Sequence, residues 1–585
     1  MEKKMILGID LGTSNSMAAV YKDKKVELVK SRTGSHIIPS VVSMDENGAF
    51  YTGDMALQRK KQYPDMTVQM FKRSMGTAAL FELGEKKFKA EELSTILLKA
   101  IKEEAEAYFG EEITDAVISV PAFFNNPQRK AVMEAGKQAG FDVKRIINEP
   151  TAAAVAYGIH GMEQMEDGIN QSNGTKANGE TKHKDVIIVL DLGGGTFDIS
   201  VMEVDDSVME VVAICGDNKL GGGDFTQRLV ELFKEANAIH SELTIEENAR
   251  LWEKAQQAKH QITAEGFGEI KCVIEEREYR YAITEAEYED ACYDLLDRMR
   301  KLTLQAVEES KYEPYEVKDI IMVGGGTKLS IVRKMIEKMI GKDIRYKINP
   351  DEAVVRGAAL QGALLTREEG LKELIMTDIC SHYIGDAVSH RCEYDMAKNF
   401  DVIIPKNTTI PVKRTVQQYA WPARWIFEVL QCENEFGIDV VPLDKFYYVV
   451  PDLGTSQTVM VEKTIFYDVN GIMYAEVYIP ATEVRYSKVL QSEDEEYLEQ
   501  ETATKLEKLN LIQHNMGEKD EDELLMARAE RMYEEATGKE RETINKHITA
   551  YESARNARKI SEMRQTREAL IKLLDAYENV IGEWE

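Results

Sequence analysis

The chain has 585 residues, of which 43% are hydrophobic, and its 102 Asp and Glu outweigh 73 Lys and Arg, giving a net charge of −29. This length predicts roughly three or four domains, and the charge repels phosphate backbones and anionic lipid, so we expect neither nucleic acid nor membrane as a partner. No apolar run approaches the ~18 residues of a membrane span, and the start lacks a cleavage-site pattern, so we expect a cytoplasmic protein. The six cysteines form no Cys-x-x-Cys pair, which argues against a disulfide framework or a zinc site.

Up to about residue 365, β-branched runs alternate with amphipathic stretches, as in the predicted strand Ala116–Val120 and helix Gln128–Gly140. This alternation predicts α/β layers. Two segments repeat one theme, a strand, an Asp-Leu-Gly turn and a second strand: MILGIDLGTSNSMAAV at 5–20 and VIIVLDLGGGTFDISVM at 186–202. A duplicated hairpin predicts two similar lobes that face one cleft. The alternative is chance similarity of two Gly turns, which the matching apolar flanks, Asp and Thr disfavour.

The texture of the chain changes three times further on. Residues 158–185 are polar and rich in Gly and Asn, which predicts a flexible surface insertion. The apolar string LKELIMTD at 371–378 is followed by strand-like runs separated by turn signals, which predict a β domain of about a hundred residues. These runs are Val402–Ile404, Trp425–Leu430, Thr458–Tyr467 and Met473–Ile479. After Gln491, apolar residues at helical spacing predict a helical bundle, namely Ile560, Met563, Leu570, Leu574, Tyr577 and Ile581.

Glycine-rich turns at Asp10–Ser14 and Gly193–Thr196 lie in the two repeats. Such turns bring backbone N–H groups close to phosphate oxygens, because no side chain intervenes. The carboxylates of Asp10, Asp191 and Asp198 would repel phosphates, which we explain by a Mg²⁺ ion and its waters between them. The chain contains neither a G-x-x-x-x-G-K-[ST] loop nor the dinucleotide spacing G-x-G-x-x-G. The loops alone predict a phosphate and metal site and do not decide between a kinase and another class of ATP-using protein.

Eight motifs occur in the order found in the seventy-kilodalton heat-shock chaperones, the DnaK type. They are GIDLGTSNS at 8–16, FKRSMG at 71–76, ISVPAFFNNPQR at 118–129, KRIINEPTAAAVAYG at 144–158, LDLGGGTFDIS at 190–200, LGGGDF at 220–225, IIMVGGGTKL at 320–329 and NPDEAVVRGAALQG at 349–362. The likeness continues through VIIPKNTTIPVKR at 402–414 and FYDVNGIMYAEV at 466–477 and weakens toward the C-terminus. The pair FKRSMG and IMTDIC at 375–380 resembles the HscC-like branch most closely.

This resemblance implies a multidomain chain: an actin-like two-lobed α/β ATPase domain at 1–370, a linker at 371–378, a β-sandwich peptide-binding domain at 379–490 and a short α-helical lid at 491–585. It implies an ATP-dependent molecular chaperone of protein folding and the stress response, in which ATP hydrolysis controls binding and release of unfolded polypeptide. The implied cofactors are ATP or ADP and Mg²⁺, with K⁺ as a further candidate ion. The implied partners are unfolded or extended polypeptide clients, a J-domain co-chaperone and a nucleotide exchange factor.

Residue by residue, the resemblance assigns catalysis to Lys72, Glu149, Asp191, Thr196 and Asp198, and the metal to Asp10, Asp191 and Asp198. Lys72 would neutralise the γ-phosphate, and Glu149 or Asp198 would orient water. The alternatives are a solvated Lys72 and a salt-bridged Glu149 at a helix start, which the motif context disfavours. The implied nucleotide contacts are Gly12, Thr13, Ser14, Gly193, Gly194, Gly195, Thr196, Gly222, Gln256, Lys259, His260, Thr263, Gly324, Gly325, Lys328 and Asp351.

The adenine side departs from the family pattern. The family's Glu, Lys, Arg and Ser on the adenosine helix align with Gln256, Lys259, His260 and Thr263, and the Arg after Gly-Gly-x-Thr is Lys328. Both arginines that would sandwich the base are therefore replaced. Since Lys is a point charge and Arg a flat plate that stacks on a ring, we expect weaker stacking and looser ADP binding.

The coupling residues are also altered. The resemblance places Arg145 opposite Asp378, the last linker residue, and makes Pro121 and Arg129 transmission residues. The leucine string expected in the linker reads Ile-Met-Thr at 375–377, and the following Pro is Ser381, so we expect altered allosteric coupling. A J-domain would bind near Arg145, Asn148 and Thr151.

Three functions remain in competition. A chaperone ATPase leads, and the rivals are an actin-fold small-molecule kinase and a nucleotide sensor or holdase that does not cycle. In the β domain, Trp421 and Trp425 could shape a client groove, but we expect them to pack in the core instead.

Overall fold

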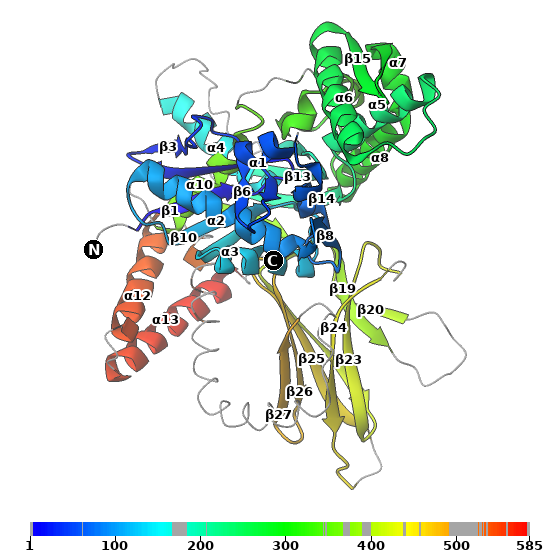
Figure 1. Cartoon of the computed structure of the whole chain (residues 1–585). Helices are drawn as coiled ribbons and strands as arrows, with labels where there is room; N and C mark the ends of the chain where they lie inside the picture. Colours follow the sequence, from blue (N-terminus) through cyan, green and yellow to red (C-terminus); the bar gives the residue numbers. More distant parts are fainter. Residues whose placement is uncertain are drawn as a thin grey trace. The chain divides into compact units, whose positions relative to one another are not determined.

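The computed structural model describes residues 4–60, 62–166, 184–205, 208–342, 344, 348–366, 375–388, 399–436, 440–454, 458–490, 525, 529, 532–533, 536, 538–556 and 560–581. The chain divides into two compact units, Met1–Leu371 with Thr377–Ser492 and Lys372–Met376 with Glu493–Glu585. Figure 1 shows several sheets with helices in the first unit, and two helices labelled α12 and α13 in the second. The four domain ranges expected from the sequence divide the chain differently and stay predictions.

A mixed sheet in the order β11-β10-β1-β2-β3, with β4 beside β2, forms the first lobe. Its strands β1 and β10 are apolar runs without alternation, as expected for strands covered on both faces. The strands of the sheet are β1 (Ile6–Asp10), β2 (Asn15–Lys22), β3 (Lys25–Leu28), β4 (Ile38–Pro39), β10 (Asp115–Val120) and β11 (Asp142–Asn148). Beside it lie the small strands β5 (Val41–Met44), β6 (Phe50–Thr52), β7 (Thr67–Gln69), β8 (Leu80–Leu83) and β9 (Lys86–Lys89).

The second lobe repeats this plan. Its sheet runs in the order β17-β12-β13-β14-β18-β21. The strands are β12 (Asp185–Leu192), β13 (Phe197–Asp205), β14 (Val208–Asp217), β17 (Val317–Val323), β18 (Ile375–Ile379) and β21 (Thr409–Ile410), and a separate hairpin consists of β15 (Phe267–Ile274) and β16 (Arg277–Thr284). In both lobes an antiparallel hairpin, β1–β2 or β12–β13, stands beside a parallel strand, β10 or β17. The duplicated hairpin predicted from the sequence is therefore confirmed.

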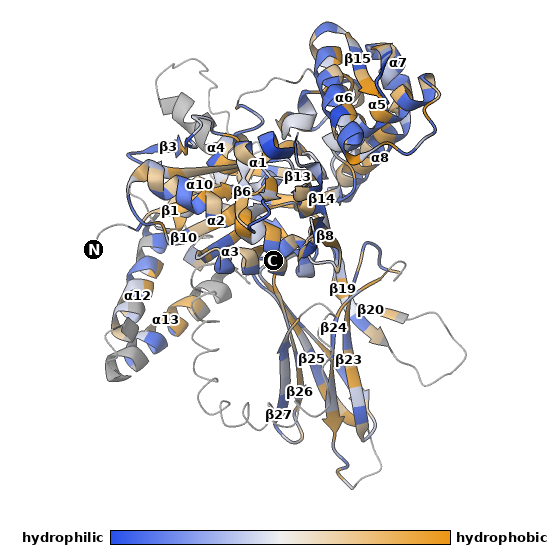
Figure 2. Ribbon diagram, in the orientation of Figure 1, coloured by the Kyte–Doolittle hydropathy of each residue, from blue (hydrophilic) through white to orange (hydrophobic). Residues whose placement is uncertain are grey.

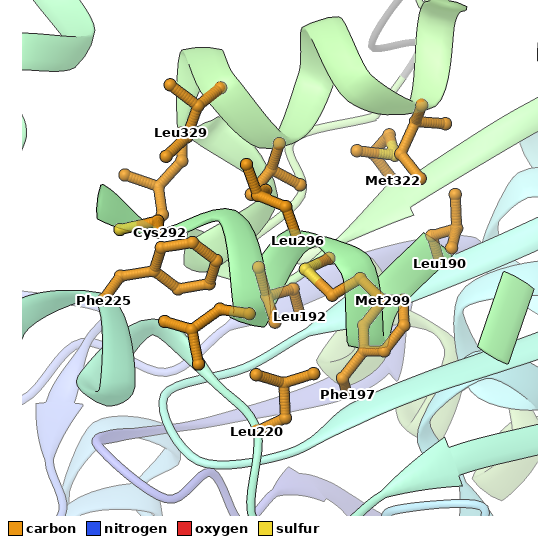
Figure 3. Close-up of a cluster of buried hydrophobic side chains, with 14 of the residues drawn as sticks. Leu190, Leu192, Phe197, Leu220, Phe225, Cys292, Leu296, Met299, Met322 and Leu329 are labelled. Carbon is orange, nitrogen blue, oxygen red and sulfur yellow. The ribbon is translucent and has the colours of Figure 1, made fainter. Parts of the chain in front are cut away.

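The core of the second lobe lies between this sheet and helices α5 (Gly222–Ala236) and α8 (Tyr293–Glu309). Side chains from β12, β13 and the helices meet there, and Figure 3 shows Leu190, Leu192, Phe197, Phe225 and Met299 among them. Phe225 and Met299 are completely buried. Burial of a side chain of this size contributes about 1.5–3 kcal/mol, so this cluster holds the glycine loop after β12 on a rigid base.

Helices cover both sheets, and several begin at side-chain caps. The helix predicted at 128–140 is α3 (Asn126–Gln138), in which Asn125 accepts a hydrogen bond from the Gln128 N–H. Such a cap satisfies one of the N–H groups that the first helical turn leaves without a partner. The other helices of this unit are α1 (Gly53–Lys60), α2 (Ala90–Phe109), α4 (Glu149–Glu166), α5 (Gly222–Ala236), α6 (Ile245–Glu265), α7 (Glu285–Ala291), α8 (Tyr293–Glu309), α9 (Ser330–Ile340) and α10 (Ala353–Leu365), with 3₁₀ turns η1 (Pro64–Met66), η2 (Phe71–Ser74) and η3 (Gly325–Lys328).

Helices α4 and α10 pack at the base of the two lobes through a glycine. A Cβ on Gly357 would lie 1.7 Å from the carbonyl oxygen of Ala152, a contact that no real side chain makes. Gly8 in β1 is equally close to α10, since a Cβ there would lie 2.2 Å from the Ala359 nitrogen. The backbones can approach this closely only because both positions are glycine.

Two four-stranded antiparallel sheets follow β18, the strand that overlaps the expected linker and is called the linker strand below. One runs β20-β19-β23-β24 and the other β22-β25-β26-β27. Their strands are β19 (Tyr383–Val388), β20 (Asn399–Ile404), β22 (Val412–Ala420), β23 (Ala423–Cys432), β24 (Val441–Val450), β25 (Val459–Tyr467), β26 (Met473–Ile479) and β27 (Val484–Val489). Figure 2 shows hydrophobic and hydrophilic residues alternating along them, the pattern of strands with one buried face. Three of the four predicted strands fall within β20, β23 and β26, and the fourth, Thr458–Tyr467, begins one residue before β25.

The expectation for the two tryptophans is confirmed for one of them only. Trp425 is partly buried against the β-domain core, and its indole N–H donates to the Trp421 carbonyl at 2.9 Å. Trp421 itself is 59% exposed, so the expectation that it packs in the core was wrong. It lies in the turn between β22 and β23, where the side chain has too few neighbours to be covered.

The second unit contains α12 (Gly538–Asn556) and α13 (Ile560–Ile581). The apolar spacing predicted a helix over this last stretch, and α13 has the same first and last residues as the pattern. Leu570 and Leu574 are buried against Ile544, Ile548 and Tyr551. The helical prediction for 491–524 lies outside the described residues.

Two further predictions fall partly outside the described residues. The insertion expected at 158–185 begins as helix, because α4 continues to Glu166, and residues 167–183 are not described. Five cysteines are buried free thiols, and Cys392 is outside the described ranges. Within the described parts of the chain, no helix is both long and apolar enough to cross a bilayer.

Candidate nucleotide site

A cleft of about 1070 Å³ opens between the two glycine loops. Asp10, Gly12, Thr13 and Ser14 line it from the first lobe, and Asp191, Gly193, Gly194 and Thr196 line it from the second. Ligand pockets commonly measure ~300–1,000 Å³, so the cleft accepts a nucleotide with its phosphates. Two of the expected site residues, Gly195 and Asp198, lie behind this lining.

The backbone of the second glycine loop packs directly against side chains of the first loop. A Cβ on Gly194 would lie 2.0 Å from the Ser14 Oγ, and one on Gly195 would lie 2.8 Å from the Thr13 Cγ2. The Gly222 and Gly223 N–H groups donate to the Gly193 and Gly194 carbonyls at 2.9 Å, which fixes the start of α5 beside the loop. Glycine is therefore required where the two hairpins face each other, and this arrangement leaves room for an anion.

Buried carboxylates gather behind the loops. Asp10 accepts a hydrogen bond from Ser119 at 3.1 Å, and Asp198 accepts one from the Phe123 N–H at 2.9 Å. Burial, and next the charge of Glu149, raise the pKa of Asp10 and of Asp198 to about 7 each. Burial, Glu149 and Asp198 also raise the pKa of Asp191 well above its usual value. The negative charges of these three carboxylates are therefore not balanced by nearby cations among the described residues.

Lys72 supplies the positive charge nearest to this group. Its Nζ lies 2.7 Å from Glu149 Oε1, and both side chains are almost fully buried. Lys72 belongs to the 3₁₀ turn η2, whereas Glu149 is the first residue of α4, so the fold brings them together over 77 positions. The alternative of a solvated surface lysine at this position is excluded by its burial.

The carboxylate set fits a hydrated divalent cation. Within the described ranges, no three His, Cys, Asp or Glu side chains approach closely enough to ligate one ion directly. Asp10 and Asp191 line the cleft, however, and Asp198 Oδ2 is buried without a hydrogen-bond partner among the described residues. A cation held through water and phosphate oxygens would balance this charge.

The adenine side holds the residues expected there. Gln256, Lys259, His260 and Thr263 of α6 line the cleft, facing Gly324, Gly325, Lys328 and Asp351. Lys259 is buried and donates to the Gly222 carbonyl and to Thr226 Oγ1, both at 2.8 Å, so its role includes fixing α5. Burial lowers the pKa of Lys259 to about 8, and burial with two nearby lysines lowers the pKa of His260.

Lys328 does not point freely at the cleft. Its Nζ forms an ion pair with Asp351. Both residues were expected at the nucleotide, and the structure couples them to each other. A lysine held by a carboxylate is less available to cover a purine ring.

The sequence analysis missed residues at the mouth of the cleft. Trp252 and Glu253 of α6 line it together with Leu57 and Lys60 of α1. The signal was present, because counting back three or four positions from Gln256 along one helix face reaches Trp252 and Glu253. A second missed contact is Arg73 with Asp224, 2.6 Å apart, which joins the FKRSMG and LGGGDF motifs.

The linker strand adds to the sheet of the second lobe. Asp378 of β18 accepts hydrogen bonds from Asn148 Nδ2 at 2.6 Å and Thr151 Oγ1 at 3.1 Å. The positive charges of Arg129 and Arg145 counteract the rise in its pKa that burial causes. Arg145 is thus near enough to act on the charge of Asp378, as expected, and Asn148 and Thr151 donate hydrogen bonds to the same carboxylate.

The β domain also contacts the two lobes directly. Asn470, in the turn between β25 and β26, accepts a hydrogen bond from the Ile146 N–H at 3.0 Å. Lys406 forms an ion pair of 2.7 Å with Glu309 of α8. Arg129 donates to Asn148 at 2.7 Å and so connects these contacts to the Asp378 site.

Comparisons with known proteins agree with this geometry. A family model described as "Hsp70 protein" matches residues 6–82 and 79–581. The protein named "Chaperone protein DnaK" from Thermosipho melanesiensis is 34% identical over 489 residues, covering 81% of this chain and 78% of the relative. Its namesake from Thermotoga neapolitana is 37% identical over 428 residues, covering 71% and 67%. The chain therefore belongs to the Hsp70 family.

Proposed function

We propose that this protein is an ATP-dependent molecular chaperone, an ATPase whose hydrolysis cycle controls how its β domain holds unfolded polypeptide. The observation that carries the proposal is a continuous set of contacts from the cleft to the β domain. Asp378, in the linker strand β18, contacts the end of β11 and the start of α4, and Asn470 of the β domain contacts β11. The relatives' name, "Chaperone protein DnaK", supports the same function.

The phosphate end of the cleft provides what phosphoryl transfer to water requires. Thr13, Ser14 and the loop from Gly193 to Thr196 would hold the phosphates with backbone N–H groups, and Lys72 would neutralise the γ-phosphate. Glu149, held by Lys72, would orient the attacking water. Mg²⁺ bound near Asp10, Asp191 and Asp198 would balance the phosphate charge; K⁺ is a further candidate for the same anionic group.

The β sandwich would bind extended, apolar segments of unfolded clients by strand pairing and side-chain pockets. The helices after residue 491 would act as a lid on it. A J-domain co-chaperone would bind near Arg145, Asn148 and Thr151, and a nucleotide exchange factor would open the lobes. The predicted ranges 1–370, 371–378, 379–490 and 491–585 and a cytoplasmic location belong to this proposal.

Two rival functions are less favoured. A small-molecule kinase of actin fold would leave the β sandwich and its contacts with α4 without a purpose. A holdase that does not cycle would not need the buried Lys72–Glu149 pair at 2.7 Å in the cleft.

Single-turnover hydrolysis of ATP by the whole chain, with and without an unfolded apolar peptide, tests the proposal. A chaperone releases inorganic phosphate faster when the peptide is present. Phosphorylation of a small molecule would establish the kinase, and the absence of turnover in either condition would establish the holdase.

A further inference from the structure

A histidine that follows the linker strand packs against the ATPase lobe. The ring of His382 lies 4.3 Å from the ring of Phe123, with 39° between their planes. His382 is 8% exposed and Phe123 7%, and the His382 Nδ1 lies 2.9 Å from the Ser381 Oγ. The ring pair is thus a closed contact between the start of the β domain and the loop between β10 and α3.

The backbone of Phe123 touches the nucleotide site. Its N–H donates to Asp198 Oδ1 at 2.9 Å, and its carbonyl accepts from Asn218 at 3.2 Å. Arg129 holds the two neighbouring carbonyls, those of Ala122 and Phe124, at 3.0 Å each. A single residue therefore carries the His382 contact on its side chain and the Asp198 contact on its backbone.

Asp198 lies outside the lining of the cleft, whereas Asp10 and Asp191 form part of it. One of its carboxylate oxygens is occupied by the Phe123 N–H, and the other is buried with no hydrogen-bond partner among the described residues. The loop that His382 packs on therefore fixes this carboxylate, through the Phe123 N–H, at a place outside the cleft lining.

Two cations act on the ring of His382, namely Lys406 in the turn after β20 and Arg129 of α3. Asp378, four positions earlier in the chain, accepts hydrogen bonds from Asn148 and Thr151. Burial, with these two cations, lowers the pKa of His382 to about 3. The packed ring is neutral at any physiological pH.

We propose that His382 is a positioning residue for hydrolysis: by packing on Phe123, its ring keeps Asp198 outside the cleft lining while the linker strand is docked. When the contact opens, the ring enters water and can take up a proton. Burial and the charges of Lys406 and Arg129 disfavour return of a protonated ring to its site, so acid favours the open form. This inference rests on the proposed ATPase function.

The expected pH effect follows from the two states of the ring. An exposed histidine titrates near pH ~6.5, so at pH 5.5 about ten of eleven open molecules carry the proton. The ratio of docked to open molecules should therefore fall about tenfold between pH 7.5 and pH 5.5, because only the neutral ring docks. A non-titrating side chain of similar size removes this dependence.

Hydrogen exchange of residues 375–388 in the whole chain with saturating ATP measures docking, and His382→Leu is compared with wild type at each pH. We expect protection to fall about tenfold from pH 7.5 to 5.5 in the wild type and not in His382→Leu. His240→Leu, which changes an exposed histidine, is the matched control and should follow the wild type. Equal pH dependence in wild type and His382→Leu would overturn the proposal.

Single-turnover hydrolysis at pH 7.5 measures the effect on Asp198. We expect His382→Ala, which removes the ring contact, to accelerate hydrolysis severalfold, while His382→Leu, which keeps an apolar contact, stays within twofold of the wild type. In a double-mutant cycle with Phe123→Ala, the second change should add little to the first.

Additive effects in this cycle, or a wild-type rate in His382→Ala, contradict the role of the ring pair. These outcomes differ from failure of the proposed function, in which the wild type itself would show no peptide-stimulated hydrolysis.

Discussion

Lys72 is the cation that acts on Asp10, Asp191 and Asp198 alike, and it forms an ion pair with Glu149. Its ammonium would neutralise the γ-phosphate in the transition state. We expect Lys72→Ala to bind ATP and to hydrolyse it ~10²–10³-fold more slowly, the usual cost of losing one such electrostatic contact. Single-turnover phosphate release measures it.

Lys86→Ala is the control for this change, because Lys86 is an exposed lysine of the same lobe. It should leave the rate unchanged. A rate for Lys72→Ala within threefold of the wild type would show that Lys72 has no catalytic role.

The ion pair of Lys328 with Asp351 removes a cation from the base, and His260 replaces the second arginine of the family pattern. We expect Lys328→Arg, His260→Arg and the double variant to bind ADP more tightly, because a guanidinium stacks on the purine. A gain of ~0.5–2 kcal/mol corresponds to roughly 2–30-fold. Calorimetric titration with ADP measures it, and unchanged affinity in the double variant would refute the stacking argument.

At the scale of elements, the crossing of α4 and α10 depends on a missing side chain. A Cβ at Gly357 would lie 1.7 Å from the oxygen and 2.3 Å from the carbonyl carbon of Ala152, so Gly357→Ala must push the two helices apart. We expect a loss of at least ~1–3 kcal/mol in the free energy of unfolding, the range for overpacked cores. Thermal unfolding of the whole chain, followed with and without ATP, detects it.

Gly362→Ala, on the same helix, is the matched control. A Cβ there meets the side chain of Ile6 at 3.0 Å, which can shift slightly, and alanine favours the helix by up to ~1 kcal/mol. We expect this variant to be close to neutral. Equal losses in the two variants would mean that the Gly357 contact is not the critical one.

At the scale of the whole molecule, Asp378, Asn470 and Lys406 contact the two lobes, and we expect these contacts to make nucleotide and client binding interdependent. Linkage requires that ATP weakens peptide binding by the same factor by which peptide weakens ATP binding. We expect a common factor of ~5–150. Fluorescence titration of Lys72→Ala, in which hydrolysis does not disturb equilibrium, measures both affinities, and ATP-independent peptide affinity would refute the coupling.

The sequence alone determined many of the helices, strands and turns of this protein, because the residues that specify each of them lie within the same short segment. The two Asp-Leu-Gly hairpins, the strand Met473–Ile479 and the helix Ile560–Ile581 follow from apolar periodicity and turn residues within each segment. The two glycine loops that line the cleft were equally predictable as close-approach turns, since only glycine lets the backbones come so near; their role in phosphate binding stays a prediction.

Only the tertiary structure decided which distant residues meet. Lys72 and Glu149, Lys406 and Glu309, and His382 and Phe123 are paired by the packing of separate elements, and no spacing in the sequence encodes these distances. The same packing left Trp421 exposed and engaged Lys328 with Asp351. Local pattern sets the elements, whereas burial and charge, which shape the site and its connection to the β domain, arise only when the elements come together.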